Sequence, residues 1–260
     1  MRFALRATDP IPIECERLDI GALAGLSPLE AAKRTIHHGN RTVELGQFFD
    51  VEANGTDELH FSGDLSNVHG LGQGMTGGTV CIDGAIGRRC GAMMAGGTVR
   101  IDGGAGGWLG CEMKGGTIRL TGTAGPHAGG AFPGSRRGMT GGSIRIGGHA
   151  GPECAATMRR GTVVVDGDVG EFAAAAMIAG TLVVRGKLGG KAGAGMKRGT
   201  IVALGGCLEV SPGHRFSCTA ELAYLNLLFA RIGLSGPPPA VRVHRGDLLT
   251  GGRGELLVAV

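Results

Sequence analysis

The chain has 260 residues, 53 of them glycine, and a formal net charge of +4 at pH 7. A charge so close to balance gives no indication of nucleic-acid binding. No apolar run approaches the roughly 18 residues that a membrane span needs, and the charged first residues do not fit a signal peptide. The seven cysteines contain no Cys-x-x-Cys pair, which indicates reduced thiols in a cytoplasmic protein.

Residues 1–70 do not follow the pattern of the central chain, and we expect them to form a small α/β cap. Within them, Ser27 is placed as the N-cap of a helix, Glu30 completes a capping box, and Gly39 ends the helix. Residues 58–63 resemble an imperfect first unit of the repeat that follows. Terminal units of repeat proteins are atypical because they must cover the exposed core and strand edges.

Residues 71–205 are organised by a segment of the form Met-x-x-Gly-Thr that recurs seven times, with Ser143 in place of the threonine in the fourth unit. The methionines are 19 residues apart, except for one interval of 26 residues. A fixed period of this length is typical of a stack of equal structural units. The repeated methionines are interpreted as flexible core fillers, and they are Met75, Met94, Met113, Met139, Met158, Met177 and Met196.

Each unit predicts a short strand, because the fifth and seventh residues after the methionine are almost all β-branched or Leu. Glycines supply the corners and leave no room for a helix. The sequence therefore predicts a mainly β fold: a single-stranded, right-handed parallel β-helix of about seven 19-residue coils. Equivalent side chains of successive coils would stack at about 4.8 Å. A second inward stack is expected at the position between paired glycines: Ile86, Ala105, Ala124, Ala150, Val169 and Leu188.

The single interruption of the repeat is the insertion at residues 126–138, which contains His127, Arg136 and Arg137. Insertions in repeat proteins form loops, commonly on a working face. We expect either a plain surface loop or a contact between these three residues and a partner protein or an anionic ligand. His127 has no second histidine or carboxylate at ligand spacing and by itself supports no catalytic role. No catalytic motif is visible elsewhere, so no catalytic residue and no metal site are assigned in the chain.

Two cysteines of the repeat, Cys90 and Cys154, each lie four residues before a repeat methionine. They are interpreted as small corner fillers, because the spacing of metal ligands is missing.

One outward-facing row predicts an interaction surface. Between the two buried residues of each strand, the seven units carry a basic half and an apolar half. Stacked arginines repel one another unless an acidic group meets them, and a row of exposed valines usually marks an interface. We expect the row to dock on a partner protein or on an acidic cofactor tail, with a solvated charged face as the alternative; it runs Cys81, Arg100, Arg119, Arg145, Val164, Val183, Val202.

Residues 206–260 leave the repeat and are expected to form a C-terminal cap. Residues 219–232 predict a helix with one apolar face, which Gly233 ends. Short strands are expected after it. The helix has the right size to lie across the open end of the β-helix or to reach a partner.

The repeated coil resembles the β-helix found in two groups of proteins. One is the C-terminal domain of the large subunit of glutamate synthase, and the other is the C subunit of formylmethanofuran dehydrogenase and of the formyltransferase/hydrolase complex. The residues outside the coils favour the second group. Similar features are the Ser27-Pro-Leu-Glu-Ala-Ala segment, the insertion Pro133-Gly-Ser-Arg-Arg-Gly-Met139, and the ending with Gly246-Asp-Leu and Gly254-Glu-Leu.

This resemblance implies a non-catalytic scaffold subunit of a complex that transfers and hydrolyses formyl groups carried on methanofuran or methylofuran. It implies an amidohydrolase-like subunit, a formyltransferase subunit and a third chain as partners, with no nucleic acid and no membrane. The chain alone would bind no cofactor. Because the family's carrier has a glutamate-rich tail, Arg136 and Arg137 or the basic row would contact that tail.

Other functions stay open at this point. One is the C subunit of a redox-active tungsten or molybdenum formylmethanofuran dehydrogenase, and another is a stand-alone glutamate synthase β-helix subunit. A left-handed β-helix acyltransferase fits less well, because such proteins repeat in hexapeptides. A carbohydrate-binding β-helix is also disfavoured, since aromatic residues for sugar stacking make up only 4% of the chain.

Overall fold

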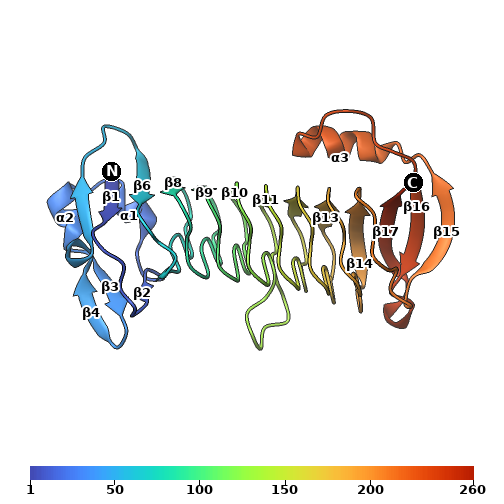
Figure 1. Ribbon diagram of the computed structural model, residues 1–260, viewed down its shortest axis with the longest axis horizontal. Coiled ribbons are helices and arrows are strands. Elements are labelled where there is room, and N and C mark those ends of the chain that lie inside the picture. Colours follow the sequence, from blue (N-terminus) through green and yellow to red (C-terminus); the bar gives the residue numbers. More distant parts are fainter.

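The computed structural model describes residues 1–260 and shows a straight rod with a cap at each end (Figure 1). A 13-stranded sheet runs along the rod in the order β15-β16-β17-β14-β13-β12-β11-β10-β9-β8-β6-β1-β5. The seven repeats supply its central strands, all parallel: β8 (Thr79–Asp83), β9 (Thr98–Asp102), β10 (Thr117–Leu120), β11 (Ser143–Ile146), β12 (Thr162–Val165), β13 (Thr181–Val184) and β14 (Arg198–Ala203).

The register confirms the predicted stacking of equivalent residues. Val80 pairs with Val99, and Ile118 pairs with Ile144 across the insertion. The second predicted stack is also present, as a ladder of parallel bridges from Leu65 through Ile86 to Cys207. The seven repeat methionines are at most 4% exposed and lie in one continuous core of 53 residues. The parallel β-helix therefore follows from a periodic sequence in which every coil buries the same positions.

The corner between the two ladders uses a backbone conformation that is rare outside glycine. At least one non-glycine residue of each corner has φ between 56° and 65°, a region that costs side chains steric energy. Hydrogen bonds between coils hold these residues in place: the Trp108 N–H donates to the Pro126 carbonyl at 2.8 Å. As a result, these side chains form a second outward row along the rod: Arg89, Trp108, His127, Glu153, Phe172 and Lys191.

The N-terminal cap extends the rod and adds a second sheet. Strands β1 (Arg2–Leu5), β5 (Phe49–Glu52) and β6 (Glu58–Ser62) continue the large sheet, and three buried phenylalanines on them pack together, with Phe3 stacked on Phe61 at 4.5 Å. The second sheet has the order β4-β3-β2-β7. Its strands and the cap's helices are β2 (Ile13–Glu14), β3 (Thr35–His38), β4 (Arg41–Glu44), β7 (Val68–His69), α1 (Ile20–Leu23), α2 (Pro28–Ala32) and the 3-10 turn Leu45–Gln47.

The predicted N-terminal helix is much shorter than expected. Its capping box is confirmed, since the Ser27 and Glu30 side chains each bond to the other's backbone N–H. The helix nevertheless ends at Ala32 instead of continuing to Gly39, and the next residues form strand β3. Ile36 on that strand is 1% exposed, because pairing with β2 and β4 buries it in the core. Burial in a sheet thus outweighs the local signal for a longer helix.

The C-terminal cap closes the last coil with an antiparallel sheet. Strand β17 (Arg253–Ala259) pairs in parallel with β14, and β16 (Val241–Gly246) and β15 (Arg215–Ala220) follow in antiparallel order. The remaining elements are α3 (Tyr224–Ile232) and a 3-10 turn at Leu248–Thr250.

The predicted helix over 219–232 begins five residues late, because Thr219 and Ala220 extend β15 and pair with β16. None of the helices has the length and the apolar character needed to cross a lipid bilayer.

Candidate functional site

The outward row of the repeat strands is one unbroken column that passes from polar to apolar. Cys81 pairs with Arg100, Arg145 pairs with Val164, and Val202 pairs with Leu257 of β17. The column also begins one strand earlier than the sequence indicated, because His60 of β6 pairs with Cys81. Its members share one backbone geometry, so differences along it come from the side chains and from what covers them.

The valine half of the column is buried inside the protein. Val164 is 4% exposed, and Val183 and Val202 are fully buried. They form a separate apolar cluster with Leu225 of α3 and with Val241, Val243 and Leu257 of the C-terminal sheet. The expectation of an exposed apolar stripe is therefore wrong: helix α3 lies along the flank of the rod, not across its open end, and covers the three valines (Figure 1).

The arginine half is left open, apart from its last member. Arg145 is bound to Asp166 through two hydrogen bonds of 3.2 Å and donates to the Ile232 carbonyl at 3.0 Å. This carbonyl belongs to the last turn of α3, where a cation is favoured by the helix dipole. Arg100 pairs with Glu58 at 3.0 Å. Arg119 between them is exposed and has no ion pair, so it is the free cation of the column.

The insertion forms a loop that leaves the rod at the edge opposite α3 (Figure 1). Arg136 and Arg137 in this loop are both exposed, and neither makes an ion pair with an acidic side chain. The Phe132 N–H donates to the Glu112 carboxylate at 3.2 Å and ties the loop to the third coil. The loop therefore presents two unpaired guanidinium groups to the solvent.

His127 stands at the base of this loop among aromatic and acidic groups. Its ring stacks on that of Trp108 with the centroids 5.2 Å apart, and its Nδ1 lies 3.5 Å from the Glu153 carboxylate. The indole N–H of Trp108 is buried without a hydrogen-bond partner. These contacts fix the His127 ring at the base of the loop and leave it partly exposed.

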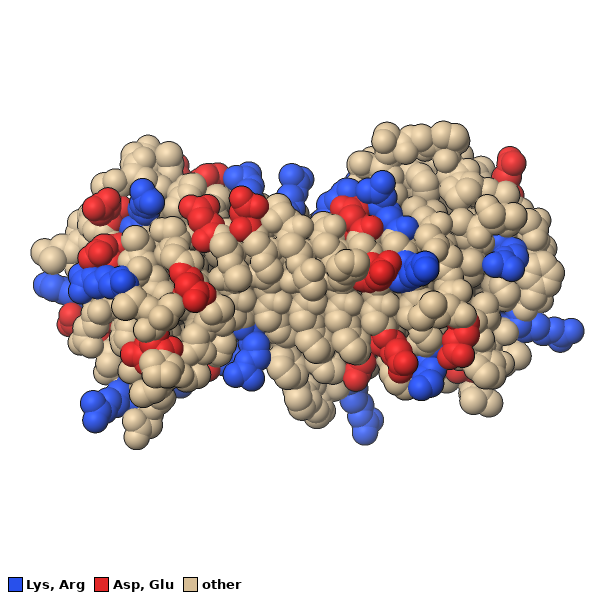
Figure 2. Space-filling model, in the orientation of Figure 1, with Lys and Arg blue, Asp and Glu red and all other residues tan.

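The two predicted basic groups do not meet. The insertion loop that carries Arg136 and Arg137 leaves one edge of the rod, whereas α3, which Arg145 of the column contacts, lies at the other edge (Figure 1). In the view of Figure 2 the middle of the rod shows a broad uncharged surface, and charged side chains lie near the ends and along the upper and lower edges. A single anionic ligand of small size would therefore contact one group only.

The cysteines are all free thiols, in line with the absence of paired spacing in the sequence. Cys90 and Cys154 are buried in the core, where loss of water raises the pKa of each thiol to about 12. Their burial within the continuous core confirms the interpretation of these two residues as corner fillers.

Helix α3 was not recognised from the sequence as the cover of the valines, because the match between the two is one of length and becomes visible only in the structure. Nine residues of helix are about 13.5 Å long, and three coils spaced at about 4.8 Å span a similar length. The apolar face of α3 thus matches the valine half of the column in length.

Comparisons with known proteins agree with the resemblance seen in the sequence. No family model matches the chain. It is 37% identical over 87 residues to the C subunit of the formyltransferase/hydrolase complex Fhc of Methylorubrum extorquens, an alignment that covers 33% of either chain. It is 34% identical over 87 residues, 32% of either chain, to the C subunit of the tungsten-containing formylmethanofuran dehydrogenase 2 of Methanothermobacter thermautotrophicus. These alignments span about a third of the length of the curated relatives.

The structural match extends over the whole chain. A chain in the crystal structure of the formyltransferase/hydrolase complex (FhcABCD) from Methylorubrum extorquens, in complex with methylofuran, superimposes with a TM-score of 0.92 and 36% identity. The match covers 100% of both chains, caps included. This protein therefore belongs to the family formed by the C subunits of the formyltransferase/hydrolase complex and of the formylmethanofuran dehydrogenases.

Proposed function

We propose that this chain is a scaffold subunit, without an active site of its own, of a complex that transfers and hydrolyses formyl groups carried on a methanofuran-type cofactor. The observation that carries the proposal is the structural match over the full length of both chains to a component of the methylofuran-bound complex. The whole-chain match favours a formyltransferase/hydrolase complex over a tungsten or molybdenum dehydrogenase. The partners would be an amidohydrolase-like subunit, a formyltransferase subunit and a third chain.

The proposed docking surface is the open half of the column around Arg100 and Arg119. Arg119 is exposed and makes no ion pair within the chain, and a partner with an acidic patch would supply one. The valine half is not included, because α3 already buries it. Arg145 contributes less than expected, since Asp166 and the Ile232 carbonyl already bind its guanidinium.

The insertion would contact the acidic tail of the cofactor. Arg136 and Arg137 are exposed and unpaired, and the stacked His127 lies at the base of their loop. Guanidinium groups bind carboxylates in a bidentate manner, which suits a tail built of glutamates. This loop faces away from α3, so partner docking and tail binding would use different faces (Figure 1).

Purification of the tagged chain from native extract tests the scaffold proposal. We expect the partner proteins to co-purify, formyl transfer and hydrolysis to appear in the assembled complex, and neither activity to appear in the isolated chain. Acyl transfer by the isolated chain would contradict the proposal. A co-purifying molybdopterin or tungstopterin subunit would assign the chain to the dehydrogenase instead.

Two charge reversals separate the proposed surfaces. Arg119→Glu should weaken assembly by about tenfold or more, because it places a carboxylate where an acidic partner docks. Arg137→Glu serves as the matched control for assembly and should leave it unchanged, but should raise the KM for the cofactor. Equal co-purification of wild type and Arg119→Glu would remove the column from the interface.

A further inference from the structure

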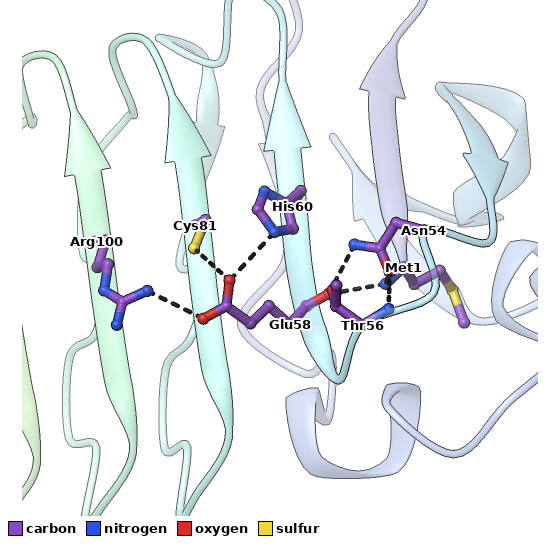
Figure 3. Close-up of polar contacts among 7 residues, drawn as sticks. All are labelled: Met1, Asn54, Thr56, Glu58, His60, Cys81 and Arg100. Carbon is purple, nitrogen blue, oxygen red and sulfur yellow. Dashed lines mark hydrogen bonds and ion pairs between the residues drawn. The ribbon is translucent and has the colours of Figure 1, made fainter.

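Three different metal-binding side chains meet where the N-terminal cap joins the rod (Figure 3). Glu58 and His60 are two residues apart on β6, so they point to the same face of the sheet. Cys81 of β8 pairs directly with His60. One carboxylate oxygen, one imidazole nitrogen and the sulfur all lie within 4.8 Å of one another.

The spacing of these atoms fits the edges of a zinc tetrahedron. Zinc binds carboxylate oxygen and imidazole nitrogen at about 2.0–2.2 Å and thiolate sulfur at about 2.3 Å, so tetrahedral angles give edges of about 3.4 Å for N···O and about 3.6 Å for S···O. The His60 Nε2 lies 3.4 Å from the Glu58 Oε2. The Cys81 Sγ lies 3.7 Å from the same oxygen. A zinc ion would thus find two edges of its coordination shell already formed.

The surroundings hold the cluster in this arrangement. Arg100 donates to the Glu58 Oε1 at 3.0 Å, which orients the carboxylate and leaves Oε2 directed at His60 and Cys81 (Figure 3). The Glu58 carbonyl accepts a hydrogen bond of 2.8 Å from the terminal ammonium of Met1 and another from the Asn54 side chain. Partners of this kind, which hold a ligand from behind, are typical of protein metal sites.

The protonation state of the thiol sets the chemistry of binding. In the metal-free protein the Cys81 S–H donates to the Glu58 Oε2 at 3.7 Å, so the thiol carries a proton. Binding would replace the S–H proton by a sulfur–zinc bond and release that proton to water. The side chains of Glu58 and His60 are 37% and 33% exposed, which leaves room for a fourth ligand from the solvent side.

We propose that Glu58, His60 and Cys81 form a zinc site with three protein ligands and one open coordination position. The site would fasten β6 of the cap to β8, the first strand of the repeat. It lies in the same column as the open arginines, so the fourth position faces the surface on which a partner or an anionic ligand would dock. The assignment does not depend on the function proposed above.

Titration of the metal-free full-length chain with Co²⁺, a spectroscopic substitute for zinc, tests the site. We expect one equivalent to bind, with a thiolate-to-cobalt charge-transfer band and the intense visible bands of tetrahedral cobalt, and Zn²⁺ to displace it. Cys81→Ser should abolish the charge-transfer band. His60→Gln and Glu58→Gln should weaken binding by more than about tenfold. Matched controls are Cys218→Ser, an exposed free thiol, and His149→Gln, an imidazole beside Asp168; both should bind cobalt like wild type.

X-ray absorption of the Zn²⁺-loaded wild-type chain gives a readout that needs no variant. One sulfur among nitrogen and oxygen ligands is expected. Binding that stays weak and non-stoichiometric, a charge-transfer band that survives in Cys81→Ser, or a zinc shell with no sulfur would each overturn the proposal.

Discussion

The two halves of the outward column have the same strand geometry and register, yet one half is exposed and the other is buried. At Arg119 the side chain is exposed and makes no ion pair, whereas at Val183, three strands further along the rod, the side chain is fully buried. The protein covers the apolar half with its own helix α3 and leaves the basic half to the outside. Covering valines gains stability from apolar burial, whereas covering unpaired arginines would cost desolvation energy.

At the boundary between the two halves, one arginine contacts both the covering helix and an acidic side chain of the next coil. Arg145 is the last arginine of the column, and its guanidinium binds the end of the helix that covers the valines. Asp166 on the next coil neutralises it at 3.1 Å. The change from open to covered thus takes place at one side chain, which divides the column into an exposed surface and a buried one.

The largest effect on stability is expected when a charged side chain and an apolar side chain are exchanged between the two halves. Val183→Arg would bury an unpaired charge beneath α3 and should lower the free energy of unfolding by on the order of 5 kcal/mol, measured by urea denaturation. The matched change in the open half, Arg119→Val, should alter it by less than about 0.5 kcal/mol. A Val183→Arg variant as stable as wild type would mean that α3 does not cover the column in solution.

Shortening a buried side chain of the covering helix α3 should cause the next largest loss of stability. Leu225 of α3 is fully buried against the valines, so Leu225→Ala should cost about 3 kcal/mol. The loss should be local, with faster amide exchange in α3 and unchanged exchange in β9 and β10. Leu227→Ala is the control, since that side chain on the same helix is 76% exposed and its removal should be nearly neutral. Equal losses for the two variants would contradict the placement of the helix.

The parts of this structure that follow from periodicity were predictable from the sequence. The 19-residue repeat places Val80 on Val99 and Ile86 on Ala105 without any knowledge of the fold, because every coil must bury the same positions. The same reasoning predicted the order of the outward column. It started the column one strand too late, because the His60 coil lacks the methionine and glycine signature of the others.

The contacts that lie outside the repeat were not predictable in the same way. Nothing local distinguishes a helix that covers its own rod from one that reaches a partner, so the burial of Val183 by Leu225 was missed. The N-terminal helix was overextended for a related reason: Ile36 belongs to a strand only because the distant segments around Ile13 and Val68 complete its sheet. Such long-range pairing is set by the whole chain and leaves a weak local trace.

Arg145, which lies at the boundary between the two halves, gives a third and smaller expected effect on stability. Arg145→Ala removes the hydrogen bond to the Ile232 carbonyl and one partner of Asp166, and should cost about 1–2 kcal/mol. Arg185→Ala is the control, because Arg185 also binds Asp166 at 3.1 Å but does not bond to the end of α3. Its side chain is half exposed, so its loss should cost at most about 0.5 kcal/mol. Both changes in the free energy of unfolding are to be measured by thermal unfolding of the isolated chain. Equal costs would show that the arginine acts through Asp166 alone.

The smallest predicted effect is that of acid on stability, which should differ between the C-terminal cap and the rod. Residues 79–203 bury no charged or histidine side chain, whereas the C-terminal cap contains His214 and the half-buried His244. Burial lowers the pKa of both imidazoles. Below the unfolded value of about 6.5, the unfolded chain therefore binds protons that the folded cap does not, and stability falls as the pH decreases.

Between about pH 7 and about pH 5, hydrogen exchange corrected for its intrinsic rate should accelerate in β15, β16 and α3, while β9 and β10 serve as an internal reference. The covered half of the column would then loosen with its cap while the open half keeps its structure. Uniform acceleration along the rod, or greater protection of the C-terminal cap in acid, would show that the buried imidazoles do not control this cover. The contrast follows from composition. The apolar core of the rod, with its methionine, valine and alanine side chains, has no group that binds a proton in this pH range, whereas the C-terminal cap contains buried histidines.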